Sequence, residues 1–458
     1  MSVQTLGSEV NATRLARVSS DALAHIPGDD GWPIVGNTFS ILADPKGFVE
    51  KQAKRYGLVH RIRAFGATYV ALLGPEANEL VLLDHEKLFS SALGWGFVLD
   101  QVFPRGLMLF DFDEHRLHRR ALSVAFKSGP MQSYLTQLNA GIANGLKQWP
   151  SGREFKFYPA IKQLTLDLAA TSFLGAELGP ELEAVKQSFV AMVAASIAVI
   201  RKPLPGTQLR RGVRGRAFIV DYFNRQIARR RERGGEDLFS QLCRATWDDG
   251  SLLSNADIVD HMSFLMMAAH DTLTSSLTSF VYQLAANPEW QRKLRDEHRG
   301  LGISLVDPLP FNRLDEFEQT EMAFKEAMRL APPVPSIPRR AVRDLVFKGF
   351  RIPAGTRVSI NPLFTHHMAN IWPEPERYDP MRFSSDASRD RHKFAFVPFG
   401  GGAHMCLGLN FAYMQAKCFA WHFLKNFQVT IAPDYRPDWR MWPIPRPRDG
   451  LAVTLVRV

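Results

Sequence analysis

The 458-residue chain is poor in cysteine, with only Cys243, Cys406 and Cys418. Three cysteines cannot form a disulfide framework, so we expect a reducing compartment and a cytoplasmic protein. Long apolar runs are also missing. The longest, residues 189–200, is shorter than the roughly 20 residues that span a bilayer, and the first twenty residues lack the apolar core of a signal peptide. These absences predict a soluble protein.

Acidic residues are scarce in one segment, residues 201–235. Eleven Lys and Arg residues stand there against Asp221 and Glu232, which gives a net charge of +9 in a chain whose total is +10. No aromatic interleaving or nucleic-acid motif accompanies this charge, so we expect no nucleic-acid partner. Two interpretations stay open. Segment 201–235 attracts amphipathic acids or contacts an anionic membrane surface, or it is a solvated basic helix face.

No repeat, low-complexity tract or Gly/Ser linker divides the sequence. We therefore expect a flexible N-terminal segment, residues 1–25, followed by one large domain, residues 26–458. Strand-like runs occur at 59–64 and 68–73, whereas residues 113–287 are mostly helical in pattern. The sequence predicts a mainly α fold with a small β part.

The longest predicted helix begins after Ser254, where Asp257 completes a Ser-x-x-Asp start, and ends at Asn287, which precedes a proline. About thirty residues at 1.5 Å each would cross the whole domain. Its apolar centre contains His270 and Asp271. A carboxylate in the middle of a buried helix must be paired, hydrated or functional.

The strongest chemical signal is the segment 399–408, FGGGAHMCLG. Three consecutive glycines let the backbone approach a large flat group closely. Cys406 follows them and precedes a helix-like stretch, residues 407–424, whose N-terminus would stabilise a thiolate. Ligation of iron by such a sulfur favours cleavage of the O–O bond. Cys243 and Cys418 have no such context and are interpreted as buried structural cysteines.

This segment resembles the cysteine loop of the cytochrome P450 family, Phe-x-x-Gly-x-Arg/His-x-Cys-x-Gly, and the other marks of the family follow in order along nearly the entire chain. The resemblance implies the cytochrome P450 fold, a single large domain that encloses haem b, with Cys406 as the axial sulfur ligand to iron. It also implies cofactor contacts at Phe399, Gly400, His404 and Gly408.

Two further groups of residues match the family. Glu326 and Arg329 form its Glu-x-x-Arg pair, and Arg382 lies in its Pro-x-Arg-Phe box, which implies a structural triad beneath the haem. The i, i+4 spacing of His115 and Arg119 places both on one helix face. The resemblance implies that these two residues and Arg339 bind the haem propionates, with Arg340 as a rival to Arg339.

In the long helix, residues 268–272 (AAHDT) resemble the oxygen-activating motif of the family. The resemblance implies that Asp271 and Thr272 are catalytic and deliver protons during oxygen activation. Ala269 replaces the usual glycine, which predicts a smaller local distortion of the helix. Leu273 replaces the usual second hydroxyl, although Thr274 follows.

Substrate contacts in this family come from variable regions, and the corresponding residues here are apolar, which predicts a small hydrophobic substrate. Similarity to the retinoid and sterol branch favours a terpenoid, retinoid, steroid or fatty-acid-like molecule. The candidate contacts are Phe97, Val98, Leu107, Phe264, Met267, Val334 and Ile337.

The leading hypothesis is a monooxygenase that inserts one oxygen atom of O₂ into this substrate. The chain carries no flavin or iron–sulfur motif, so we expect a separate ferredoxin or flavodoxin-type electron donor with an NAD(P)H reductase. Two alternatives stay open. One is a peroxide-driven haem-thiolate peroxygenase or an isomerase, and the other is a non-catalytic haem or ligand sensor.

Overall fold

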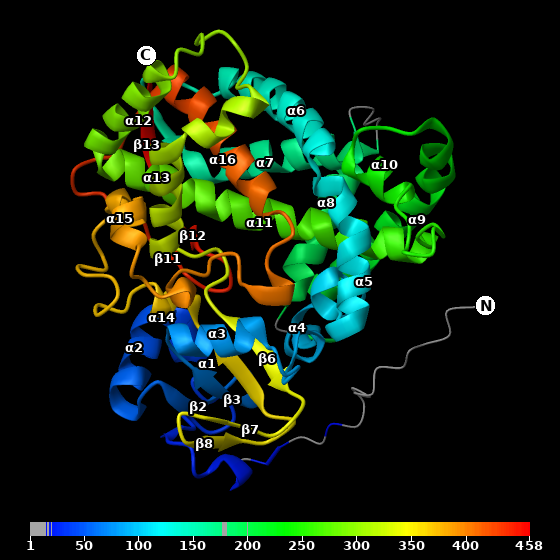
Figure 1. Ribbon diagram of the computed structural model, residues 1–458, viewed down its shortest axis with the longest axis vertical. Helices are drawn as coiled ribbons and strands as arrows, with labels where there is room; N and C mark the ends of the chain where they lie inside the picture. The colour runs from blue at the N-terminus through cyan, green and yellow to red at the C-terminus, as the bar shows by residue number, and fades with distance from the viewer. Residues whose placement is uncertain (1–14, 16–17, 20, 176–180, 199) are drawn as a thin grey trace.

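The computed structural model describes residues 15, 18–19, 21–175, 181–198 and 200–458 (Figure 1). Most of the N-terminal segment predicted to be flexible, residues 1–25, lies outside the described residues. The predicted mainly α fold with a small β part is confirmed. Within the described ranges, no helix combines the length and the apolar character needed to cross a membrane.

The helices are α1 (Thr38–Ala43), α2 (Pro45–Tyr56), α3 (Pro75–Leu83), α4 (Ser91–Leu99), α5 (Phe112–Ser123), α6 (Ser128–Lys147), α7 (Phe157–Leu174), α8 (Leu182–Ser196), α9 (Gln208–Arg233), α10 (Leu238–Cys243), α11 (Asn255–Ala286), α12 (Pro288–Gly300), α13 (Glu318–Leu330), α14 (Pro362–Thr365), α15 (Ser385–Ser388) and α16 (Leu409–Asn426). Most of the helices fill the upper part of the molecule in Figure 1, whereas α1, α2 and α3 lie beside the sheet at its lower end.

The largest sheet lies at the lower end of Figure 1, with strand order β1-β2-β3-β9-β6-β4. Smaller sheets have the orders β10-β13-β5, β11-β12 and β7-β8. The strands are β1 (Gly28–Asp29), β2 (Val59–Ala64), β3 (Ala67–Leu72), β4 (Phe89–Ser90), β5 (Glu154–Lys156), β6 (Ile337–Ala341), β7 (Leu345–Phe347), β8 (Phe350–Ile352), β9 (Arg357–Ile360), β10 (Phe427–Thr430), β11 (Trp439–Arg440), β12 (Arg446–Pro447) and β13 (Ala452–Arg457).

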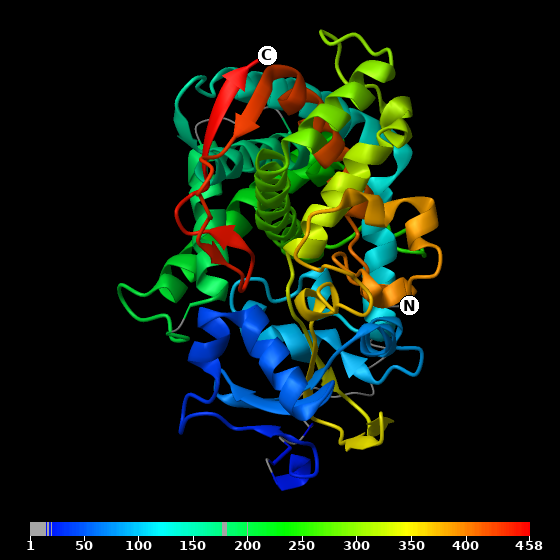
Figure 2. The same cartoon turned by 90° about the vertical axis from the view of Figure 1, so that its left-hand side faces the viewer.

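Helix α11 runs through the middle of the helical part and is seen nearly end-on in Figure 2. The hydroxyl of Ser254 accepts from the Asp257 N–H at 3.1 Å and donates to the Asp257 carboxylate at 2.6 Å, so the predicted N-terminal cap is present. The helix ends at Ala286, before Asn287 and Pro288. Its 32 residues span about 48 Å and give side chains access to the centre of the protein.

Two apolar cores meet beside the cysteine segment. The larger core joins the long helices, and the second joins β2, β3, β6 and β9 to α3. The ring of Trp95 on α4 packs against both cores. The chain that leads into α16, drawn in orange in Figure 1, crosses this boundary. The cysteine segment is therefore held between a helical bundle and a sheet.

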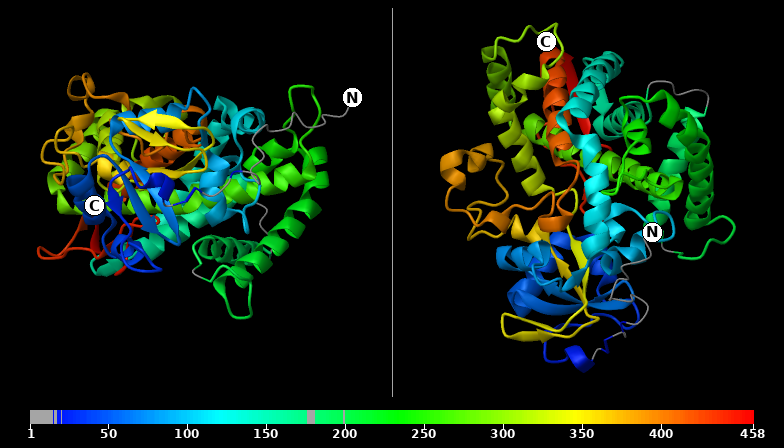
Figure 3. Two further views of the ribbon diagram at one scale, coloured as in Figure 1. Left: turned by 90° about the horizontal axis from the view of Figure 1, so that it is seen from below. Right: turned by 45° about the vertical axis from the view of Figure 1, so that its right-hand side comes forward.

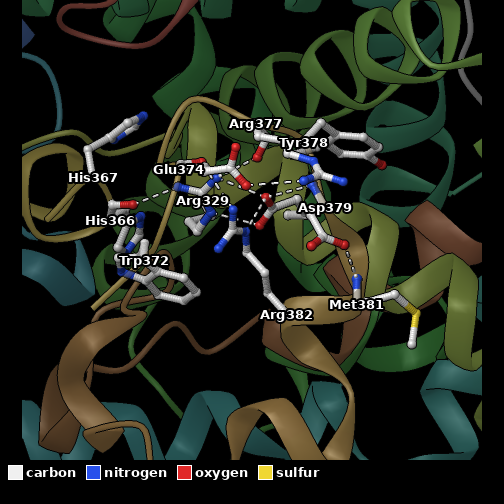
Figure 4. Close-up of polar contacts among 12 residues, drawn as sticks. Arg329, His366, His367, Trp372, Glu374, Arg377, Tyr378, Asp379, Met381 and Arg382 are labelled. Atoms are coloured by element: carbon white, nitrogen blue, oxygen red, sulfur yellow. Dashed lines mark hydrogen bonds and ion pairs between the residues drawn. The ribbon is translucent and has the colours of Figure 1, made fainter. Parts of the chain in front are cut away.

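A buried carboxylate with its guanidinium partners anchors this boundary (Figure 4). Glu326 accepts two hydrogen bonds from Arg329, at 2.7 and 2.8 Å, and both side chains are fully buried. The Arg382 Nε lies 3.4 Å from the same carboxylate, and the Asp379 N–H donates to it at 3.0 Å. Burial raises the pKa of Glu326 against the opposing effect of Arg329. The structure thus brings the three predicted triad residues together.

The triad reaches the cysteine segment through His366. The Arg329 guanidinium donates to the His366 carbonyl at 2.8 Å, and the His366 Nε2 accepts from the Val397 N–H at 3.0 Å. Burial lowers the pKa of His366 well below its usual value, so the ring is neutral and its Nε2 can accept. Val397 precedes Phe399 by two residues. These hydrogen bonds therefore connect α13 to the chain that carries Cys406 and restrict its movement.

We expect the substitution Glu326→Gln to destabilise the protein strongly. It leaves the Arg329 charge buried beside a neutral partner, and loss of one member of a buried pair costs about 3–5 kcal/mol. Thermal unfolding measures the effect. The matched control is Glu318→Gln, an exposed residue on the same helix, for which the expected cost is below about 1 kcal/mol. Equal unfolding temperatures for the two variants would contradict this role.

Candidate functional site

The cysteine segment forms a tight loop before α16. The Cys406 N–H donates to the Phe399 carbonyl at 2.9 Å, and the Gly400 N–H donates to the Val397 carbonyl at 3.0 Å. Gly400 and Gly402 have φ of +68° and +60°, a region that glycine adopts without strain. A methyl group on Gly402 would overlap the backbone of Leu82 on α3. The predicted need for glycine here therefore has a local cause.

The Cys406 thiol lies in the same loop as Gly402 and His404, which line a cavity. Cys406 is exposed, yet enough protein surrounds the sulfur that burial raises its pKa. The Gly408 N–H, which donates to the sulfur, and the charge of Arg119 oppose this effect. Cys243 and Cys418 are fully buried instead, and burial raises the pKa of Cys243 to about 12. Cys406 is therefore the accessible thiol among the three.

Four nitrogen-bearing side chains converge near this loop. His115 and Arg119 come from α5, Arg339 from β6 and His404 from the loop itself. The His115 and His404 rings lie against each other with their centroids 3.9 Å apart and their planes tilted by 34°. All four residues line a cavity of about 590 Å³. All four were predicted as cofactor contacts, the first pair from helix spacing and family resemblance and the other two from the resemblance, and the structure brings them together.

This cluster lacks an anionic partner among the described residues. Arg119 forms no hydrogen bond or ion pair there, and Arg339 donates only to the Pro338 carbonyl, at 2.9 Å. Two acids lie near Arg339, but Asp84 accepts from the Leu88 N–H, and Asp111 accepts from the N–H groups of residues 91 and 92. A buried cation without a counter-ion is costly. The cluster therefore fits an acidic cofactor, and haem with its two propionates is such a group.

The same geometry sets the protonation of the imidazoles. Burial, followed by the charges of Arg119 and Arg339, lowers the pKa of His115 to about 4. Burial and the charge of Arg339 lower the pKa of His404 to about 2. Both rings are therefore neutral at pH 7 in the protein alone. Burial also lowers the pKa of Arg339, to about 10, so its guanidinium stays charged.

Strand β6 separates Arg339 from its rival Arg340. Burial alternates along the strand, with Ile337, Arg339 and Ala341 buried. Arg340 therefore lies on the other face, where it donates to the Gly355 carbonyl at 3.1 Å. Of the two arginines, Arg339 shares the cavity with His404.

The middle of α11 opens to internal space. Residues 267–269, Asp271 and Thr272 are half-buried, whereas the helix is largely buried on both sides of them. The Thr272 hydroxyl donates to the Ala268 carbonyl at 2.7 Å, which leaves its lone pairs free to accept. The helix stays continuous from Asn255 to Ala286.

Asp271 lies close to two nitrogen groups. Its Oδ1 lies 3.3 Å from the Lys162 Nζ on α7 and 3.2 Å from the His270 Nδ1. Burial alone would raise the pKa of Asp271, but His270 and Lys162 outweigh it and lower the value to about 2. Asp271 is therefore an ionised carboxylate beside the Thr272 hydroxyl. Sequence reasoning missed Lys162, which lies more than a hundred residues away.

The predicted substrate contacts divide between the two cores. Leu107, Phe264, Val98 and Met267 belong to the helical core or pack on it, and Ile337 with Val334 belongs to the sheet core. The ring of Phe264 lies against the Gly106 backbone. Phe97 differs from the others because it is 52% exposed and has the Arg201 guanidinium 5.6 Å from its ring centroid.

The basic segment 201–235 forms the loop before α9, α9 itself and the start of the next loop. Helices α8 and α9 project from one side of the molecule in Figure 3. Several of its arginines form internal contacts instead of facing solvent freely: Arg201 with the Phe97 carbonyl, Arg216 with Asp260, Arg225 with Glu181, Arg230 with Asp237 and Arg231 with the Leu253 carbonyl. Within the described chain, Lys202, Arg210, Arg211, Arg214 and Arg233 lack such partners. The charge available to a ligand is therefore smaller than the sequence suggests.

Comparison with known proteins agrees with the family resemblance seen in the sequence. The family model described as Cytochrome P450 matches residues 26–447. The protein named "Putative cytochrome P450 136" of Mycobacterium tuberculosis is 38% identical over 94% of this chain and 89% of its own length. The taxane 10-beta-hydroxylase of Taxus cuspidata is 29% identical, over 94% and 89%. The solved structure of retinoic acid-bound cyanobacterial CYP120A1 superposes with a TM-score of 0.87, at 30% identity over 94% of this chain and 99% of that one.

Family and relatives together define the broad chemistry. Haem is the characteristic cofactor of this family, and the named relatives include hydroxylases and monooxygenases. The chain belongs to the cytochrome P450 family and is a haem-dependent monooxygenase.

Proposed function

We propose that the protein binds haem b through the Cys406 thiolate and oxidises a terpenoid, retinoid, steroid or fatty-acid-like molecule with one atom of O₂. The domain responsible spans residues 26–458. The observation that carries the proposal is an accessible thiol near two arginines, Arg119 and Arg339, that form no ion pair with a carboxylate of the described residues. When bound, haem supplies the site of oxygen activation, with electron density pushed from the sulfur.

The residues around the thiol have separate roles in this proposal. Arg119, Arg339, His115 and His404 bind the two propionates. Phe399 fixes the loop through its carbonyl bond to the Cys406 N–H, and its ring lies 5.3 Å from that of Tyr413. Gly400 allows the loop to turn, and Gly408 gives the sulfur an N–H donor. The triad of Glu326, Arg329 and Arg382 keeps this arrangement rigid.

Proton delivery is assigned to Asp271 and Thr272. Asp271 takes a proton from the solvent side, where Lys162 is 31% exposed, and passes it to the Thr272 hydroxyl or to water held there. The hydroxyl stays within hydrogen-bond reach of the Ala268 carbonyl, so it is oriented by the helix itself.

The substrate class rests on the apolar character of Val98, Leu107, Phe264, Met267, Val334 and Ile337. Relatives that are taxane hydroxylases and a neighbour crystallised with retinoic acid support the same class. The exposed position of Phe97 assigns it to the entrance, away from the reacting atoms.

Electrons come from a separate ferredoxin or flavodoxin-type donor with an NAD(P)H reductase. Lys87 and Arg116 are exposed at the rim of the cavity that contains His404, where both lie within ion-pair distance of the single carboxylate of Asp113, at 3.7 and 3.4 Å. An acidic partner fits this rim because opposite charges steer association. The donor therefore docks on the Cys406 side.

We expect Cys406→Ala to abolish the thiolate-type absorption of the reduced carbon monoxide complex. The reason is that the variant has no thiol in the loop to bind iron. Cys418→Ala is the control, since this thiol is fully buried on α16, and it should keep the wild-type spectrum. A wild-type protein that stays colourless after haem supplementation would refute the proposal.

We expect Arg119→Leu to weaken haem binding about ten- to a hundredfold, because a hydrogen bond to a charged group contributes about 1.5–3 kcal/mol. Haem transfer to an excess of apomyoglobin measures the loss. Arg120→Leu is the control: this neighbouring arginine is exposed and pairs with Asp248 at 2.9 Å. If both variants release haem at the wild-type rate, Arg119 does not bind a propionate.

The free cations at the start of α9 suggest attraction of amphipathic acids toward the substrate entrance. We expect the double substitution Arg210→Ala and Arg211→Ala to slow association of retinoic acid about two- to fivefold at low salt, since steering depends on local charge. Stopped-flow spectroscopy of the spin-state change measures the rate. Arg233→Ala, at the far end of α9, should leave it unchanged. An association rate independent of salt would exclude steering, and vesicle binding lost in the double variant would favour an anionic membrane instead.

A further inference from the structure

His270 occupies an unusual position between α11 and α7. The residue is 5% exposed. Its Nε2 lies 3.2 Å from the Lys162 carbonyl oxygen, and its Nδ1 lies 3.2 Å from the Asp271 Oδ1. Lys162 thus contributes its carbonyl to His270 and its ammonium group to Asp271, at 3.3 Å. The three side chains form one compact group.

The ring nitrogens of His270 both face acceptors. A neutral imidazole has one N–H, whereas the imidazolium has two. Neither the Lys162 carbonyl nor the ionised Asp271 can donate a hydrogen bond. The doubly protonated ring presents an N–H to each acceptor, whereas the neutral ring presents one. The geometry therefore favours a second positive charge beside Asp271.

Asp271 is incompletely fixed by this group. Its Oδ1 is buried and lies within ion-pair distance of His270 and Lys162, but it accepts no well-aligned hydrogen bond from the described residues. A buried oxygen that lacks a hydrogen-bond donor favours movement of its side chain or binding of a proton. The carboxylate is thus held by charge more than by directed bonds, and removal of one cation would shift its position.

We propose that His270 is a positioning residue for Asp271: held by the Lys162 carbonyl, its imidazolium keeps the carboxylate where it can take protons at Lys162 and pass them to Thr272. This inference deepens the proposed function and rests on it. Each of the two protons needed in a cycle passes from solvent to the Asp271 carboxylate and from there to the Thr272 hydroxyl or its water. His270 keeps both ring protons, so no net change remains on the protein.

The effect of losing His270 can be measured from the products into which O₂ is converted. When protons arrive on time, O₂, two electrons and two protons convert substrate into hydroxylated product and water. When delivery fails, the same electrons and protons leave as hydrogen peroxide. A displacement of a catalytic group by about an ångström can cost up to a hundredfold in rate. We expect the peroxide released per O₂ consumed to rise at least about threefold in His270→Phe.

The experiment uses the haem-loaded enzyme with a ferredoxin system and retinoic acid as the probe ligand. Thr274→Val is the matched control: Thr274 also joins α11 to α7, through a 2.6 Å hydrogen bond to Thr165, but has no contact with Asp271. Wild-type carbon monoxide spectra and retinoic acid affinity in both variants, with the rise in peroxide confined to His270→Phe, support the proposal. An unchanged peroxide ratio in His270→Phe, or an equal rise in Thr274→Val, overturns it.

A second pair of measurements needs no turnover and separates this inference from the proposed function. In protein labelled with ¹⁵N-histidine, the His270 ring should show two protonated nitrogens at neutral pH. His270→Asn, which removes the charge and keeps a polar side chain, provides the assignment and a second variant for the peroxide ratio. A ring with a single protonated nitrogen overturns the inference even if the enzyme is active. Loss of the thiolate spectrum in wild type would instead overturn the proposed function.

Discussion

The buried guanidinium of Arg329 is the interaction on which the site depends. It binds the Glu326 carboxylate with two hydrogen bonds and donates to the carbonyls of His366 and Arg377. A charge removed from water is tolerated only when every donor finds a partner. These partners come from α13 and from the long connection that precedes the cysteine segment. That connection has little regular structure, so its fixed course depends on these side-chain contacts.

The functional cluster above this anchor has the opposite electrostatic character. Below the cysteine loop, Glu326 neutralises Arg329, whereas Arg119 and Arg339 have no such partner in the described chain. The buried charge of Arg329 is thus neutralised within the protein, whereas the charges of Arg119 and Arg339 remain for a ligand to neutralise. Binding of an acidic cofactor removes the free-energy cost of burying these two arginines without a counter-ion. Cofactor binding and folding stability are therefore coupled in this protein.

Local patterns predicted much of the fold and part of the site. The Ser254 cap, the following proline and the apolar period gave the bounds of α11 closely, because each depends on nearby residues. The i, i+4 spacing placed His115 and Arg119 on one helix face for the same reason. Which of Arg339 and Arg340 faces the cavity follows from strand alternation, but only after β6 is known. The role of His366 was not predictable, since it depends on contacts with Arg329 and Val397 across more than thirty residues each.

Long-range contacts also explain why the net charge counted from the sequence overstates the charge that is available to a ligand. Segment 201–235 is basic by sequence, yet Arg230 binds Asp237 and the Leu174 carbonyl, and Arg201 binds carbonyls at the ends of α4 and α8. In the same way, Asp271 is an isolated acid by sequence but lies between His270 and Lys162 once α7 packs against α11. The Lys162 ammonium group, which comes from a distant segment, thus helps to keep Asp271 ionised. The chemistry of the centre of α11 is therefore a property of the α7–α11 pair, and substitutions on α7 should affect it without contacting either substrate or cofactor.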